Sequence, residues 1–145
     1  MASEYKPNLS VRTLTASATL TKEDAGTNIV MSAAAGLTVT LPPATGTGSM
    51  FDIFAATTIT SNNYVIKVAP GTDVMAGVLV LSTDISGVSM PTGATADTIT
   101  MNGTTKGGIL GSSVRLIDVK TGLWAVSGML VTSGTEADPF SATVT

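Results

Sequence analysis

The chain has neither cysteine nor histidine among its 145 residues. The lack of cysteine removes disulfides, thiolate nucleophiles and thiolate metal ligands. The lack of histidine rules out Ser-His-Asp and Cys-His catalytic arrangements, and it removes the commonest acid–base group and metal ligand. We therefore expect a protein that is not an enzyme, with no catalytic residues, no metal site and no cofactor.

A hydrolase that uses carboxylates alone would need two acids facing one cleft, roughly 5–9.5 Å apart. Most of the ten acidic residues fall at expected turns or strand ends, where aspartate commonly serves the backbone. Asp52 and Asp118 occupy equivalent places in two similar segments and are the best pair of this kind. A surface or salt-bridge role, for instance Asp118 with Arg115, is the favoured interpretation.

Charge is scarce too. Only 12% of the residues are charged, against about 25% in typical soluble proteins, while 43% are hydrophobic and the mean hydropathy is +0.41. We therefore expect part of the surface to be buried against copies of the chain, as a dimer or trimer, or against a partner. The net charge of −3 and the lack of a basic patch predict no nucleic-acid partner.

Long hydrophobic runs are missing as well. The apolar runs are far shorter than the ~20 residues that span a bilayer, and no Lys/Arg-led signal peptide precedes them. We expect no membrane association and a chain that is soluble and intracellular when made.

The chain does contain a repeated pattern of strand, glycine-rich turn and strand, which is clearest in residues 37–54. Apolar residues alternate with threonines over 37–41, as in a half-buried strand, and a Pro-Pro pair then ends that strand. Gly46 and Gly48 allow the chain to reverse before an apolar run at 50–54. We interpret this stretch as two strands joined by a glycine-rich hairpin turn.

A similar segment follows about sixty residues later, at 97–108 (DTITMNGTTKGG), and leads into 114–118. Tyr64 and Trp124 match at the same offset. Two interpretations stay open: a duplicated three-strand unit, or the general likeness of any two hairpins in a threonine-rich chain. Trp124 alternates with Val126, and this favours a core position over a platform for stacking sugars.

Nine short strands rich in Thr, Val and Ile are expected, separated by glycine turns, and residues 21–24 (TKED) predict a single helical turn. The pattern predicts an all-β fold, which can be a sandwich, a jelly roll or a barrel. Of these we expect a single β-sandwich or jelly-roll-like domain over residues 21–145. We expect 82–95 to be a long loop and 120–122 a hairpin turn. The expected strands are 27–32, 37–41, 50–54, 64–68, 74–81, 97–101, 113–119, 123–131 and 140–144.

Residues 1–20 form a different kind of segment, because Val11, Leu14 and Leu20 are too widely spaced for a core strand. We expect an extended N-terminal arm that is either a frayed end or a tie to a neighbouring protein. Its candidate contact residues are Tyr5, Lys6 and Arg12. Deleting residues 1–20 should then leave the β domain folded.

The segment 74–81 (VMAGVLVL) contains little that is polar, so we expect a strand that is covered on both faces. Its cover would come partly from a second copy of the chain. The candidate residues of this oligomer interface are Met75, Val78 and Val80.

Five phrases in this order and spacing cover most of the chain from residue 37 onward: 38–42 (TVTLP) with the two following glycines, 73–77 (DVMAG), 97–108, 122–126 (GLWAV) and 134–140 (GTEADPF). In these phrases the chain resembles the capsid decoration, or cement, proteins of tailed bacteriophages. The resemblance implies a β-sandwich, often jelly-roll-like, that sits as an oligomer on the outside of an icosahedral head.

Such a protein would be a non-enzymatic virion structural protein, made in the host cytoplasm, that stabilises the head by bridging major capsid protein subunits. The alternative is a receptor- or glycan-binding β module of a tail fibre or adhesin, favoured by the Ser/Thr/Asn-rich loops and by Trp124.

Overall fold

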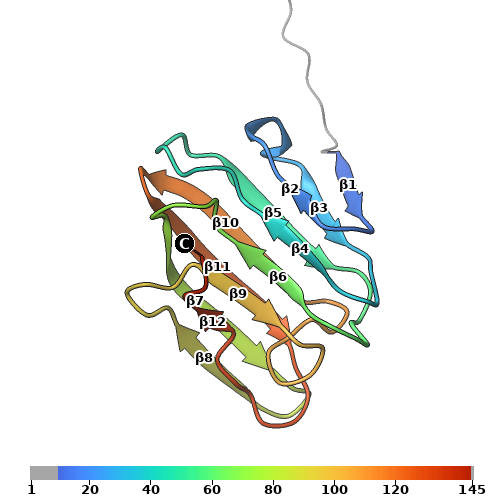
Figure 1. Cartoon of the computed structure of the whole chain (residues 1–145). Coiled ribbons are helices and arrows are strands. Elements are labelled where there is room, and N and C mark those ends of the chain that lie inside the picture. The colour runs from blue at the N-terminus through green and yellow to red at the C-terminus, as the bar shows by residue number, and fades with distance from the viewer. Residues whose placement is uncertain (1–9, 145) are drawn as a thin grey trace, which may run out of the picture.

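The computed structural model describes residues 10–144, which form twelve strands and one 3-10 turn, η1 (Lys22–Asp24) (Figure 1). The strands make two mixed sheets. One has seven strands, in the order β1 (Val11–Leu14), β3 (Asn28–Met31), β5 (Met50–Ala55), β10 (Ser113–Lys120), β11 (Leu123–Val131), β7 (Val74–Ser82) and β8 (Gly87–Pro91). The other has five, in the order β12 (Phe140–Ser141), β9 (Thr98–Met101), β6 (Tyr64–Lys67), β4 (Leu37–Thr40) and β2 (Ala18–Thr19).

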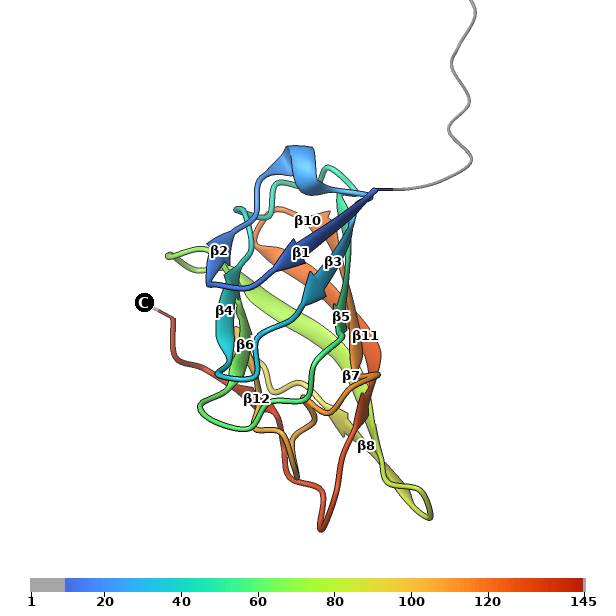
Figure 2. The same ribbon diagram turned by 90° about the vertical axis from the view of Figure 1, so that its right-hand side faces the viewer.

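The two sheets face each other, as the side view in Figure 2 shows, and the hydrophobic core lies between them. Each strand contributes alternate residues to this core because successive side chains point to opposite faces. Trp124 of β11 is fully buried, with its ring centroid 5.8 Å from that of Phe51 on β5. The core position expected for Trp124 is therefore confirmed.

The all-β expectation is confirmed, and each of the nine expected strands is present. The structure adds β1, β2 and β8, so the expected number was too low. Strand β8 lies inside the segment that we expected to be a loop, where it pairs with β7 in antiparallel fashion. Its residues are exposed except for Met90, which is partly buried against the core, so it lacks the run of buried positions that marks the other strands.

The expected hairpin around Gly46 and Gly48 is wrong. Strand β4 lies in the five-stranded sheet and β5 in the seven-stranded sheet, so the turn carries the chain from one sheet to the other. A local pattern of strand, turn and strand is the same for a hairpin and for a crossing between sheets. The strands with which each one pairs distinguish a hairpin from a crossing. Here β4 pairs with β2 and β6, whereas β5 pairs with β3 and β10.

The expected boundary of the arm at residue 20 is also wrong. Strand β1 pairs in parallel with β3, and β2 pairs in parallel with β4, so the segment 11–19 contributes an edge strand to each sheet. Leu14 and Leu20, which seemed too widely spaced to share a core strand, are both buried between the sheets. Residues 1–9 lie outside the described part of the chain.

The sequence similarity between the stretch 37–54 and the segment 97–118 does not extend to a third strand. Strands β4 and β9 share the five-stranded sheet, and β5 and β10 share the seven-stranded sheet. Tyr64, however, lies on β6 in the smaller sheet, whereas Trp124 lies on β11 in the larger one. The two halves therefore match only over strand, crossing and strand, which does not support a duplicated three-strand unit.

Candidate functional site: the outer face of the large sheet

The face of the seven-stranded sheet that points away from the core carries an apolar row. The register places Val30 of β3 beside Phe54 of β5, and it places Met129 of β11 beside Val80 of β7. Ser113 of β10 joins the two pairs. We call this row, together with Val78 of β7, the outer-face cluster: its members are Val30, Phe54, Val78, Val80 and Met129.

Members of this cluster are exposed to an unusual degree for large hydrophobic residues. The exposed fraction is 41% for Phe54, 43% for Val78 and 67% for Met129. Single exposed apolar residues are common on protein surfaces, but these gather on one face of one sheet. They form two apolar pairs, Val30 with Phe54 and Met129 with Val80, on either side of Ser113, and no other part of residues 10–144 covers Phe54 or Met129.

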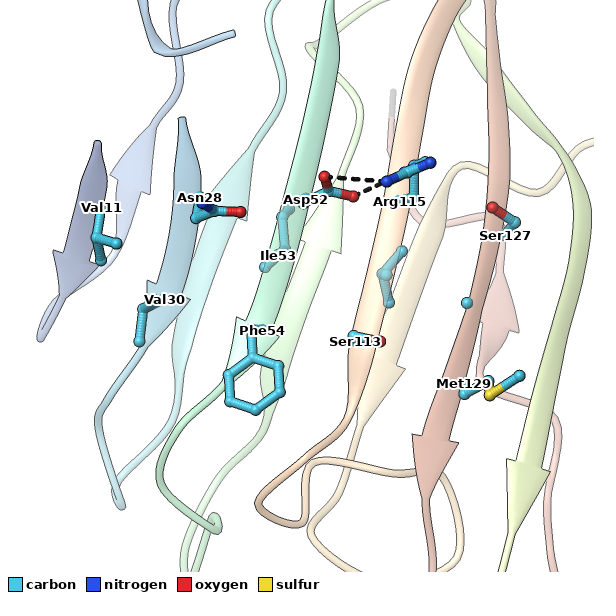
Figure 3. A pocket seen from close by; sticks show the side chains of 12 residues that line it. Val11, Asn28, Val30, Asp52, Ile53, Phe54, Ser113, Arg115, Ser127 and Met129 are labelled. Carbon is cyan, nitrogen blue, oxygen red and sulfur yellow. Dashed lines mark hydrogen bonds and ion pairs between the residues drawn. The ribbon is translucent and has the colours of Figure 1, made fainter. Parts of the chain in front are cut away.

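A polar row runs beside the cluster (Figure 3). The register aligns Asn28, Asp52, Arg115 and Ser127 on four adjacent strands. In its centre Arg115 donates two hydrogen bonds to the Asp52 carboxylate, at 2.8 and 3.3 Å. Hydrogen bonding to Asp52 and the negative charge of Asp52 raise the pKa of Arg115, so the guanidinium stays protonated at every physiological pH.

A shallow depression of ≈ 560 Å³ spans both rows, from β1 to β11. Its lining combines an aromatic ring, a methionine, aliphatic side chains and an arginine that is paired within the sheet: Val30, Phe54, Met129 and Arg115 are members. Methionine, aromatic residues and arginine are the types enriched in protein–protein interfaces. The surface is suited to another protein surface, and it presents a single carboxylate that is already held by arginine.

The structure separates the three residues that we expected at an oligomer interface. Met75 is buried in the core between the sheets, so its side chain cannot lie at an interface, and that expectation is wrong. Val78 and Val80 belong to the outer-face cluster, and their role at an interface stays a prediction. Within residues 10–144 the core packs against the inner face of β7 alone, although β7 carries apolar side chains on both faces. The cover that we expected on its outer face from a second copy stays a prediction.

Of the expected capsid-contact residues, Tyr5 and Lys6 lie outside the described residues. Arg12 lies on β1, and its Nη1 is 2.9 Å from Oδ2 of Asp24 in η1. This ion pair joins the edge strand of the large sheet to the 3-10 turn. Burial raises the pKa of Asp24, but the backbone N–H of Thr21 and the Arg12 guanidinium outweigh that effect, and the net pKa is lowered.

The pairing suggested for Asp118 with Arg115 is wrong, because Arg115 pairs with Asp52. Asp118 is buried and accepts backbone hydrogen bonds from Thr45, Gly46 and Thr47 in the crossing turn, at 3.0, 2.6 and 3.2 Å. The Thr47 hydroxyl adds a fourth bond, at 2.9 Å. Burial raises the pKa of Asp118, but these donors outweigh it and hold the pKa below its usual value of 3.8.

Sequence reasoning missed three members of the cluster: Val30, Phe54 and Met129. A signal was present, because each is an apolar residue out of phase with the core positions of its own strand. In β5, for example, Phe51 and Ile53 face the core, whereas Phe54 faces outward. A hydrophobic residue on the expected polar face of a half-buried strand is the pattern that could have found them.

Within residues 10–144 no three metal-binding side chains come together, and no helix there is long and apolar enough to cross a membrane. Comparison of the chain with protein-family models, with curated proteins and with solved structures finds no match.

Proposed function

We propose that this protein is a non-enzymatic structural protein of a phage virion, which decorates the outside of the icosahedral head and bridges major capsid protein subunits. In this proposal the two facing sheets are a β-sandwich of the jelly-roll-like kind. The observation that carries the proposal is the outer-face cluster, an exposed apolar surface on a chain with few charges. Support also comes from the resemblance to decoration proteins in the phrases from residue 38 to residue 140.

In this function the outer-face cluster lies against the major capsid protein. Phe54 and Met129 would bury their apolar surface there, and such burial contributes roughly 25 cal/mol for each Å². The polar row would lie toward the rim, where Arg115 and Asp52 can remain paired. Tyr5 and Lys6 stay candidate contacts of the same partner.

The alternative, a receptor- or glycan-binding module, loses one of its two motives in this structure. Its sugar-stacking platform was Trp124, whose ring is buried between the sheets. A sugar cannot stack on this ring without opening the core. The Ser/Thr/Asn-rich loops remain as its other motive.

The test is a decoration assay with purified heads that lack this protein. Phe54→Asp and Met129→Asp should each fold but lower the occupancy on heads at least about tenfold, because each places a charge in an apolar contact. Val65→Asp is the matched control: it lies on β6, faces outward from the small sheet, and should decorate as the wild type does. Occupancy is measured by quantitative mass spectrometry of sedimented heads.

Two results would contradict the proposal. The first is absence of the protein from purified virions at any copy number comparable with the capsid lattice. The second is full occupancy by both outer-face variants.

A further inference from the structure

Strand β8 leaves one edge of the large sheet unpaired. It is the last strand of that sheet, and within residues 10–144 it pairs with β7 alone (Figure 1). Four of its five residues are exposed, and the segment 87–91 (GVSMP) contains no charged side chain. Free edges pair readily with other strands, so proteins commonly guard them with charges, with proline or by keeping them short. The other edge strands follow this rule, because β2 and β12 have two residues each and β1 carries Arg12. Of these devices β8 has only Pro91, at its end.

The hydrogen bonds at the two ends of the β7–β8 ladder fix its phase. At one end the backbone N–H of Thr92 donates to the carbonyl of Gly77 at 3.0 Å. At the other end the backbone N–H of Thr83 donates to the carbonyl of Ser86 at 2.8 Å. Both pairs continue the register of the strand pairs between them. Hydrogen-bonded pairs alternate along an antiparallel ladder with pairs that make no backbone hydrogen bond. Every second residue of β8, counted from Ser86, therefore bonds to β7.

This phase shows which backbone groups of β8 are free. Val88 and Met90 turn their backbone groups toward β7, so Gly87, Ser89 and Pro91 turn theirs toward the free edge. Gly87 and Ser89 each offer an N–H and a carbonyl there, whereas Pro91 offers a carbonyl alone because proline lacks an N–H. These groups make no hydrogen bond to another segment within residues 10–144. They are available to a further strand.

The backbone of the same strand in a second copy is complementary to this edge. In an antiparallel pairing centred on Ser89, the two Ser89 residues exchange a pair of N–H···O=C bonds across a two-fold axis. Gly87 of each copy then lies opposite Pro91 of the other copy and donates to its carbonyl. The missing proline N–H removes only one hydrogen bond at each end of the new ladder. The central bonds are unaffected.

The side chains match in the same register. Val88 lies opposite Met90 of the other copy, at positions without backbone hydrogen bonds, where side chains on adjacent strands approach most closely. Val88 is 37% exposed, and Met90 is half-buried against the core, so both can bury further apolar surface there. At the remaining positions serine faces serine and glycine faces proline. The paired segments therefore bring no charge and no bulky polar group together.

Charge does not drive this contact. Asp84 is exposed at the tip of the β7–β8 hairpin, which extends beyond the rest of the two sheets (Figure 2), and Glu136 accepts from the Ser86 hydroxyl at the same end of β8. Asp138 lines a small depression together with Gly93, beyond the other end. Antiparallel pairing places these two ends beside each other, so acidic side chains of the two copies repel there. Added salt screens such repulsion and should leave the dimer intact or strengthen it.

We propose that two copies of this chain form a dimer by antiparallel pairing of β8 with β8, about a two-fold axis at Ser89. The pairing uses the edge of the large sheet, so it leaves both outer-face clusters free. This inference goes beyond the proposed function, because the dimer needs no capsid. A ladder of two short strands buries much less than the ~1,600 Å² of a standard interface, so the association is weak and is best detected by trapping it.

The lack of cysteine allows the dimer to be trapped by a single introduced thiol. Disulfides join Cα atoms about 4.4–6.8 Å apart, and hydrogen-bonded partners in an antiparallel pair lie at about 5.5 Å. Under a mild oxidant, Ser89→Cys should form a disulfide-linked dimer at least about tenfold faster than Ser127→Cys. Ser127→Cys is the matched control, because it places an exposed thiol on the outer face of β11. Non-reducing gels over a time course measure both rates.

Two further variants test the backbone pairing itself. Ser89→Pro removes an N–H from the free edge and no bond to β7, so the protein should fold but lose the dimer. Ser89→Ala keeps this N–H and should associate as the wild type does. Sedimentation velocity up to the highest soluble concentration measures association, and a melting curve verifies that each variant is folded.

Three results would overturn the inference. The first is equal trapping of Ser89→Cys and Ser127→Cys. The second is undiminished association of folded Ser89→Pro, and the third is a wild-type dimer that dissociates when NaCl is added. None of these measurements involves a head, so failure of this inference and failure of the decoration assay are distinguishable.

Discussion

At the scale of single residues, Asp118 shows how a buried carboxylate organises a turn that has no regular structure of its own. It lies near the end of β10 and binds three consecutive backbone N–H groups of the crossing between β4 and β5. Buried polar groups require such partners, and here each satisfies the other. The crossing is thereby fixed to a strand that follows it by some seventy residues.

The lowered pKa of Asp118 makes this contribution dependent on pH. Its folded-state pKa lies below the ordinary value of 3.8, so the stabilisation is present above that pH and is lost as the pH falls through the folded pKa. We expect Asp118→Asn to lower the free energy of unfolding by about 1.5–3 kcal/mol near neutral pH, since an amide nitrogen would face N–H donors.

Urea denaturation of both proteins over a pH series measures this effect. The gap between wild type and Asp118→Asn should narrow as the pH drops below about 4. Asp84→Asn, at the exposed tip, is the control and should change stability by less than ~0.5 kcal/mol. A gap that stays constant down to the acid limit would show that the ionised carboxylate is not the stabilising form.

At the scale of elements, two glycines on adjacent strands allow β7, β10 and β11 to pack closely. Gly77 of β7 has φ +152° and Gly128 of β11 has φ +155°, a conformation that other residues rarely adopt. A Cβ at Gly77 would collide with the carbonyl oxygen of Val126, and one at Gly128 with that of Ser113. In each case the added Cβ would meet the backbone of the neighbouring strand, which the sheet's hydrogen bonds hold in place.

We therefore expect Gly77→Ala and Gly128→Ala each to cost about 3 kcal/mol or more, through strain and collision with neighbouring backbone. Thermal unfolding followed by circular dichroism measures the loss. Gly93→Ala is the matched control, because its added Cβ would meet no atom within 4 Å. Similar melting temperatures for all three variants would refute the packing argument.

Alternation along β7 makes a second prediction at this scale. Leu79 points into the core and Val80 points outward, so lysine should have opposite consequences at the two positions. Leu79→Lys should cost more than about 4 kcal/mol and leave little folded protein, since it buries an unpaired charge. Val80→Lys should cost less than about 1 kcal/mol.

Soluble yield and a melting curve for each lysine variant distinguish these outcomes. Equal damage at both positions would mean that the outer face of β7 is covered in solution, as in a tight oligomer of the large sheets. The free outer face described above requires Val80→Lys to be tolerated.

At the scale of the whole molecule, the segment 11–20 belongs to both sheets. It begins as the edge strand of the large sheet, places Leu14 in the core, and then pairs as the edge strand of the small sheet before Leu20 is buried. Arg12 adds an ion pair to the 3-10 turn. The segment therefore closes one side of the space between the sheets.

Two truncations test this role. Deletion of residues 1–9 should leave the melting temperature nearly unchanged, because every strand from β1 onward is retained. Deletion of residues 1–20 removes two buried leucines and two ladders, and large-to-small changes at such positions cost about 2–5 kcal/mol each. We expect the longer truncation to be largely unfolded, measured by circular dichroism and by hydrogen exchange. A folded product lacking residues 1–20 would restore the arm first expected from the sequence.

What the sequence determined by itself is the local part of this architecture. Apolar residues at alternate positions and runs rich in Val, Ile and Leu indicated nine of the twelve strands. The capping pattern at 21–24 indicated η1, where the backbone N–H of Thr21 donates to Asp24 at 2.9 Å. These features depend on side chains a few positions apart, so a sequence window contains the whole cause. The core position of Trp124 followed from the same alternation.

Tertiary structure alone decided which strands pair and what lies outside. The glycine turn after β4 is compatible with a hairpin or a crossing, and the choice depends on partners far along the chain. The edge strands β1, β2 and β8 form because the neighbouring strand offers them unpaired N–H and C=O groups, which no local pattern records. The outer-face cluster likewise exists only because the register aligns residues from four strands. The spacing of hydrophobic side chains can be read from the sequence, but the pairing of the strands decides which of them become neighbours.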